Sequence, residues 1–83
     1  MNFADIKKYN QSTEGKAEFV KEVLSPLLVM IKTGLAGAEY ECENDGGSER
    51  VYFVMLNGQR MIPPVNVTAD SLKALVIDVL KAV

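Results

Sequence analysis

Acidic side chains are the residues of this 83-residue chain that could do chemistry most readily, because several of them gather in one stretch. This acidic patch consists of Glu39, Glu41, Glu43, Asp45 and Glu49. Carboxylate oxygens bind hard divalent cations, which raises the hypothesis of a metal site. Carboxylates at alternate positions of a strand lie about 7 Å apart, however, and the stretch lacks the spacing of a calcium-binding loop. We therefore interpret it as the solvated face of a strand, or as a surface that docks a basic partner.

Other catalytic chemistry has few candidate residues. Histidine is absent and the chain has one cysteine, Cys42. These two facts exclude Ser-His-Asp and Cys-His catalysis, histidine-based zinc sites and an intramolecular disulfide. Cys42 stands between two glutamates without a base to activate it, so we expect a buried, unreactive side chain. The sequence therefore predicts no catalytic residue, no cofactor, no metal ion and no enzymatic activity.

The charge pattern bears on partners and location. Nine basic and eleven acidic residues give a net charge of −2, and the basic residues are scattered apart from the adjacent pair Lys7 and Lys8. Nucleic-acid binding draws on clustered basic side chains, so we expect no direct contact with nucleic acid. The longest apolar run, 27–31, is far shorter than the ~20 residues that span a bilayer, so we expect no membrane segment. A lone cysteine and an N-terminus without an apolar secretory stretch favour a cytoplasmic location.

The middle of the chain has the pattern of a β-meander. Ala38, Tyr40 and Cys42 alternate with glutamates, which is typical of a strand with one wet face. Glycine-containing turns follow at 45–48 and 57–58. The predicted strands are Ala38–Asn44, Val51–Leu56 and Gln59–Ile62, the last ended by Pro63 and Pro64. With the first turn centred on residues 46 and 47, Glu41 faces Tyr52 and Tyr40 faces Phe53.

Helices are predicted before and after these strands. A short helix is expected at 3–9, and a long one at 14–32 with Ser12 or Thr13 as its N-cap. Pro26 should kink the long helix or split it, with Ser25 capping the second part. The last helix begins after a Thr68 cap, and its apolar stripe predicts the buried side chains Leu72, Leu75, Val76, Val79 and Leu80.

These elements predict an α+β fold, a three-stranded antiparallel β-meander packed with helices in the order α-α-β-β-β-α, as a single domain over residues 1–83. The face of the sheet opposite the helices is predicted to carry Tyr52, Val54, Leu56 and Met61, with Arg50 at the rim. Monomers seldom expose a large contiguous apolar area. We therefore expect a second copy of the chain to cover this face in a two-fold homodimer, or residues 3–9 to fold back over it.

Three functions from different classes follow from this sequence. The favoured one is a small cytoplasmic protein-interaction module whose partner is another protein or a second copy. The second is a phage or mobile-element accessory protein that presents the acidic patch to a basic host surface, a hypothesis that rests on the row of acidic residues. A carboxylate- or metal-dependent enzyme is the third, and it requires acidic residues such as Asp70 and Asp78 to converge with the patch.

Overall fold

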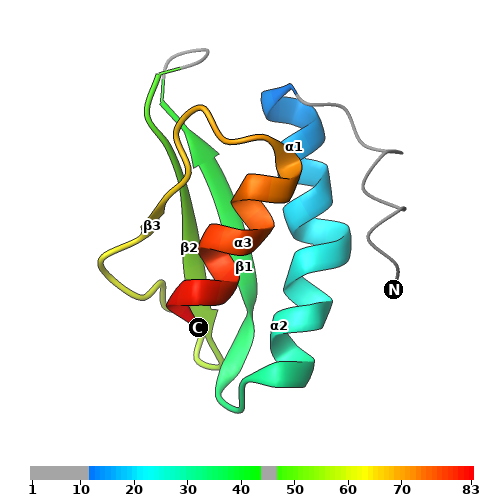
Figure 1. Cartoon of the computed structure of the whole chain (residues 1–83). Coiled ribbons are helices and arrows are strands. Elements are labelled where there is room, and N and C mark those ends of the chain that lie inside the picture. The colour runs from blue at the N-terminus through cyan, green and yellow to red at the C-terminus, as the bar shows by residue number, and fades with distance from the viewer. Residues whose placement is uncertain (1–11, 44–46) are drawn as a thin grey trace.

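Helical segments precede and follow a three-stranded antiparallel sheet in residues 12–43 and 47–83, which the computed structural model describes (Figure 1). In chain order the elements are α1 (Thr13–Phe19), the π-helical segment η2 (Val20–Leu24), α2 (Ser25–Ile31), β1 (Leu35–Cys42), β2 (Glu49–Met55), β3 (Val65–Asn66) and α3 (Leu72–Ala82). The α+β class and the order of helix, strands and helix are as predicted. The helix expected at 3–9 lies outside the described residues.

One helical run continues from residue 13 to residue 31 despite Pro26, so of the two predicted alternatives the split of the helix is wrong. Ser12 caps the run as predicted, because its hydroxyl accepts a backbone N–H of the first turn. Over η2 the hydrogen bonding widens, and the N–H of Ser25 donates to the carbonyl of Val20 five residues back. Pro26 then stands in the first turn of α2, where a missing N–H costs little. The change of hydrogen-bond register lets the helix continue through the proline.

Ser25, which we expected to cap a helix, instead joins the helix to β1. Its hydroxyl donates to the carbonyl of Ala38 and accepts from the N–H of the same residue, both at 2.8 Å. The two backbones lie so close that a Cβ at position 37 would be 3.0 Å from the Cβ of Ser25. Gly37 lies in β1, and its lack of a side chain permits this contact.

β1 and β2 pair two residues away from the predicted register. Glu41 lies opposite Arg50 and not opposite Tyr52. The N–H of Glu43 donates to the carbonyl of Ser48 at 2.8 Å, so the connection is longer than the predicted turn. Side chains alternate between faces with a period of two, so a shift of two leaves each side chain of these strands on its predicted face.

The third strand lies later in the chain than predicted. Residues 59–62 contribute a single isolated bridge, between Arg60 and Val54, in place of a strand. The chain then passes through a cis peptide bond before Pro63 and pairs with β2 again at Val65–Asn66 (Figure 1). Prolines have no N–H to donate to a strand partner, which explains why the pairing with β2 is interrupted at Pro63 and Pro64. This rule does not predict that the chain pairs with β2 again after them. The bridge also places Arg60, and not Met61, beside Val54.

The core lies between the helices and the face of the sheet that carries Ala38, Val51 and Phe53. α3 contributes Leu72, Leu75, Val76 and Val79, each at most 1% exposed, as its apolar stripe predicts. Ser71 caps α3, and not Thr68 as predicted, because the Ser71 hydroxyl accepts the N–H of Ala74. In the described part of the chain, none of the helices has both the length and the apolar character to span a bilayer.

Candidate functional site

The outer face of the sheet, opposite the core, carries a group of ion pairs around Tyr52. Arg60 donates to Glu39 at 2.7 Å and to Glu41 at 2.8 Å, and its guanidinium lies 4.5 Å from the centre of the Tyr52 ring. Arg50 donates to the Tyr52 hydroxyl at 3.1 Å. Two arginines therefore contact Tyr52, and one of them covers its ring.

Because of these ion pairs, the predicted interface on the outer face is not an exposed apolar surface. Tyr52 and Val54 are only partly exposed, and charged side chains surround them. Leu56 lies in the turn after β2 and is 74% exposed. Met61 does not share the outer face, because it lines a pocket beside Phe53 on the core side. The structure thus separates residues of the predicted interface, which was expected to comprise Tyr52, Val54, Leu56 and Met61 with Arg50 at its rim.

The acidic patch is also divided. Glu39 and Glu41 pair with Arg60, and Glu43 pairs with Arg50 at 3.3 Å. Asp45 lies outside the described residues. Glu49 belongs to the core face of β2 and is 5% exposed, so its place in a surface patch is a wrong prediction. Arginines neutralise much of the remaining charge, which weakens the case for a strand that docks a basic surface.

Glu49 is the centre of a polar cluster in which Lys16 and Glu49 are buried and Tyr40 and Asp70 are partly buried. Its Oε1 accepts from the Lys16 ammonium at 2.8 Å and from the Tyr40 hydroxyl at 2.5 Å. Its Oε2 accepts from the backbone N–H of Ala69 at 2.8 Å. One carboxylate therefore ties α1, β1 and the segment before α3 to the start of β2.

The ionisation of this cluster follows from its contacts. Burial opposes the charge of Glu49, but hydrogen bonds from Lys16, Tyr40 and Ala69 outweigh it and lower the pKa of Glu49 below its ordinary value. Burial, together with the Glu49 carboxylate, raises the pKa of Tyr40. Glu49 thus stays ionised and Tyr40 protonated at neutral pH. A carboxylate with both oxygens engaged in this way acts as a structural tie between elements.

Asp70 differs from Glu49 although the two lie in the same region. Its Oδ2 is buried and has no hydrogen-bond partner among the described residues. Burial and then the carboxyl of Asp78 raise the pKa of Asp70 to about 6. Two neighbouring carboxyl groups with pKa values displaced in opposite directions are a feature of acid–base sites. In residues 12–43 and 47–83, however, no three His, Cys, Asp or Glu side chains are placed to hold a metal ion.

The sequence contains a signal for this cluster. Lys16 lies three and four residues before Phe19 and Val20, so it occupies the apolar arc of its helix. Glu49 precedes Val51 and Phe53 at alternate positions, on the core face of its strand. Opposite charges at core positions of two elements indicate a buried ion pair, because an unpaired buried charge is too costly. Cys42, expected to be buried, is a partly buried free thiol.

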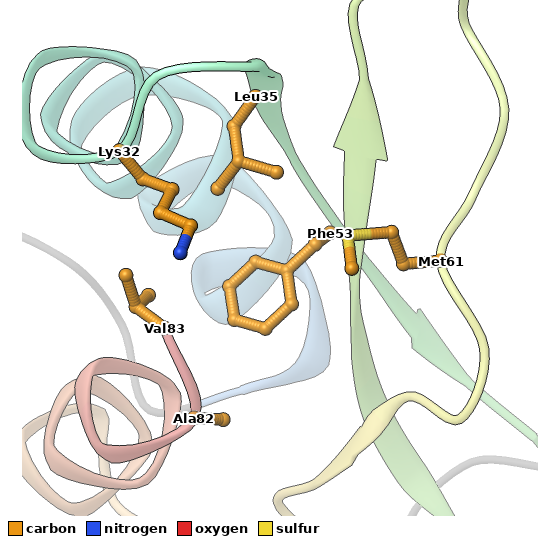
Figure 2. A pocket seen from close by; sticks show the side chains of 6 residues that line it. All are labelled: Lys32, Leu35, Phe53, Met61, Ala82 and Val83. Atoms are coloured by element: carbon orange, nitrogen blue, oxygen red, sulfur yellow. The ribbon is translucent and has the colours of Figure 1, made fainter.

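A pocket of about 100 Å³ opens where α2 and α3 end. Its walls are Lys32, Leu35, Phe53, Met61, Ala82 and Val83 (Figure 2). The walls are mainly apolar, with one lysine at the rim. Exposed large apolar side chains also lie on the segments that supply or adjoin the pocket's lining residues, namely the last turn of α2, the turn after β2 and the segment that follows it. We call the group formed by Met30, Ile31, Leu56, Met61, Ile62 and Val83 the apolar end.

Comparison of the chain with protein-family models, with curated proteins and with solved structures finds no match. Function must therefore be argued from the geometry of the molecule.

Proposed function

We propose that this protein is a small interaction module that binds a protein partner through its apolar end. The observation that carries the proposal is the exposure of large apolar side chains at one end of the molecule, led by Ile62 at 84%, Met30 at 83% and Leu56 at 74%. Single exposed apolar residues are ordinary, but a group of them around a pocket is typical of a contact surface. The ends of α2 and α3 and the turn after β2 meet in this region (Figure 1).

The outer face of the sheet is the less favourable docking surface. Its arginines and glutamates already pair with one another, so a partner would have to replace those contacts. Exposed ion pairs of this kind contribute little to binding when they remain solvated. Contact surfaces draw their affinity from buried apolar anchors, which the apolar end offers.

A homodimer is one form of this proposal, in which the apolar ends of two copies cover each other. The free thiol of Cys42 fits a reducing compartment, and we propose that the partner is met in the cytoplasm. Sedimentation velocity over a range of protein concentrations measures self-association directly. Dimers that dissociate on Leu56→Ser, but persist in a variant of the outer face such as Arg60→Gln, would place the contact at the apolar end.

A heterologous partner is tested by affinity capture with matched variants. Wild-type protein, Ile62→Ser and the outer-face variant Arg60→Gln are immobilised, and proteins retained from a cell lysate are compared by quantitative mass spectrometry. Ile62 is highly exposed, so its replacement leaves the core intact. We expect a retained protein whose recovery falls with Ile62→Ser and is unchanged with Arg60→Gln. Monomeric behaviour together with equal recovery on all three baits would contradict the proposal.

A further inference from the structure

The pocket at the apolar end combines apolar walls with a positive charge. Leu35 of β1 and Phe53 of β2 line the pocket from the sheet, and Val83 lines it from the end of α3 (Figure 2). Lys32 follows the last residue of α2 and directs its ammonium group into the hollow between these side chains (Figure 2). The side chain therefore lies over the pocket and not along the helix.

The charge of Lys32 is available to a ligand. In residues 12–43 and 47–83, no ion pair or side-chain hydrogen bond engages its ammonium group. Three other basic residues are paired, namely Lys16 with Glu49, Arg50 with Glu43, and Arg60 with Glu39 and Glu41. An ammonium group beside apolar walls is less well hydrated than one in open solvent, so a carboxylate brought to it forms a stronger contact.

We infer that the pocket takes one large apolar side chain of a partner protein, and that an acidic residue adjacent to this side chain pairs with Lys32. The inference rests on the proposed function and specifies its partner as a segment in which Asp or Glu neighbours Leu, Ile, Met or Phe. A volume of about 100 Å³ is well below the several hundred Å³ of ordinary cofactor sites, which favours a single side chain as the occupant. The lysine then fixes the direction in which the segment lies.

The test is a selection from a phage-displayed library of random linear peptides on wild-type protein, Lys32→Glu and the matched control Lys73→Glu. Lys73 is exposed on α3, outside the pocket. We expect wild type and Lys73→Glu to enrich peptides with an acidic residue beside a large apolar one. Lys32→Glu should instead enrich peptides with Lys or Arg at that place. Equal enrichment by wild type and Lys32→Glu would overturn the inference.

Binding of the most enriched peptide, measured by fluorescence anisotropy, separates the inference from the proposed function. Lys32→Gln should weaken binding by about fivefold, the scale of one partly exposed ion pair, and Lys73→Gln should leave it unchanged. Binding that is lost in Leu56→Ser but indifferent to Lys32→Gln overturns the acidic partner and retains the interaction module. Binding that is indifferent to both variants overturns both. A dimer formed through the apolar end without a contribution from Lys32 also overturns the acidic partner.

Discussion

Replacement of Asp70 by asparagine is expected to stabilise the protein at neutral pH. Oδ2 of Asp70 is buried without a hydrogen-bond partner in the described part of the chain, and burial raises the pKa of this carboxyl to about 6. At pH 7 the folded protein therefore holds a carboxylate in surroundings that disfavour its charge. Asparagine has nearly the same shape and no charge, so Asp70→Asn removes this cost and keeps the packing.

The magnitude follows from the linkage between proton binding and folding. A rise of the pKa of Asp70 from 3.8 to about 6 corresponds to at most about 3 kcal/mol of destabilisation at neutral pH. Asp70 as a whole is only partly buried, and solvent screening reduces the expected gain from Asp70→Asn to about 1 kcal/mol. For a domain of this size, that gain raises Tm by about 4–8 °C.

The stability gained in Asp70→Asn should depend on pH, and the sign of this dependence distinguishes Asp70 from other ionisable groups. Between pH 3.8 and about 6 the folded state binds more protons at Asp70 than the unfolded state does, so this group adds stability as the pH falls through that range. The advantage of Asp70→Asn should therefore shrink to about half at pH 5. Glu49 acts in the opposite sense, since its lowered pKa gives stability that is lost when the pH falls below its ordinary value of 4.5. Measurements at pH 5 and above keep the two effects apart.

Urea unfolding followed by far-ultraviolet circular dichroism at about pH 7.5 and about pH 5 measures both quantities. Glu18→Gln is the matched control, because Glu18 is exposed on α1 and its neutralisation should leave the free energy of unfolding nearly unchanged. Asp78→Asn should give part of the gain, since Asp78 contributes to the raised pKa. A loss of stability in Asp70→Asn at pH 7.5, or a gain of the same size at both pH values, would refute the reasoning.

Further predictions concern the core, the backbone and the buried ion pair. Leu75→Ala should reduce the free energy of unfolding by about 2–5 kcal/mol because Leu75 is fully buried, and an unchanged urea midpoint would contradict its place in the core. Ala69→Gly should add up to about 1 kcal/mol, since Ala69 has a φ of 63° that glycine adopts without strain; calorimetry should show a higher Tm. Glu49→Gln should cost about 3 kcal/mol by leaving the Lys16 ammonium unpaired. The double variant Lys16→Met/Glu49→Gln should recover part of that loss, and simple additivity of the two changes would argue against a coupled pair.

Local patterns predicted those parts of the fold that depend on periodicity. The apolar stripe of α3 identified Leu72, Leu75, Val76 and Val79 as core residues, because an amphipathic helix buries one arc regardless of its neighbours. Alternation likewise assigned Tyr40 and Phe53 to the core face of the sheet. These assignments survive an error in register, since a slip of two residues does not exchange the faces.

Features that depend on contacts between distant segments were predicted less well. The glycines at 46 and 47 predict a tight turn centred on them. The hydrogen bond that closes the connection instead joins Glu43 and Ser48, so the connection is longer. The return of the chain to β2 at Val65–Asn66 has no local signal, because Pro63 and Pro64 favour the end of a strand. Ser25 was assigned a capping role from its position before Pro26, but its hydroxyl satisfies the backbone of β1 instead.

The candidate site also depends on contacts between distant segments, which local sequence patterns do not predict. Exposed apolar residues of α2, the turn after β2 and the end of α3 are separated by long stretches of sequence, so only the fold brings them to one end of the molecule. The prediction of an apolar interface on the outer face did not include Arg60. A single bridge to Val54 places Arg60 on this face. There it covers the ring of Tyr52 and pairs with Glu39 and Glu41, so a surface expected to be apolar is charged and internally satisfied. A contact surface needs exposed apolar side chains. Because Arg60 covers those of the outer face, we propose the apolar end as the contact surface and not the face of the sheet.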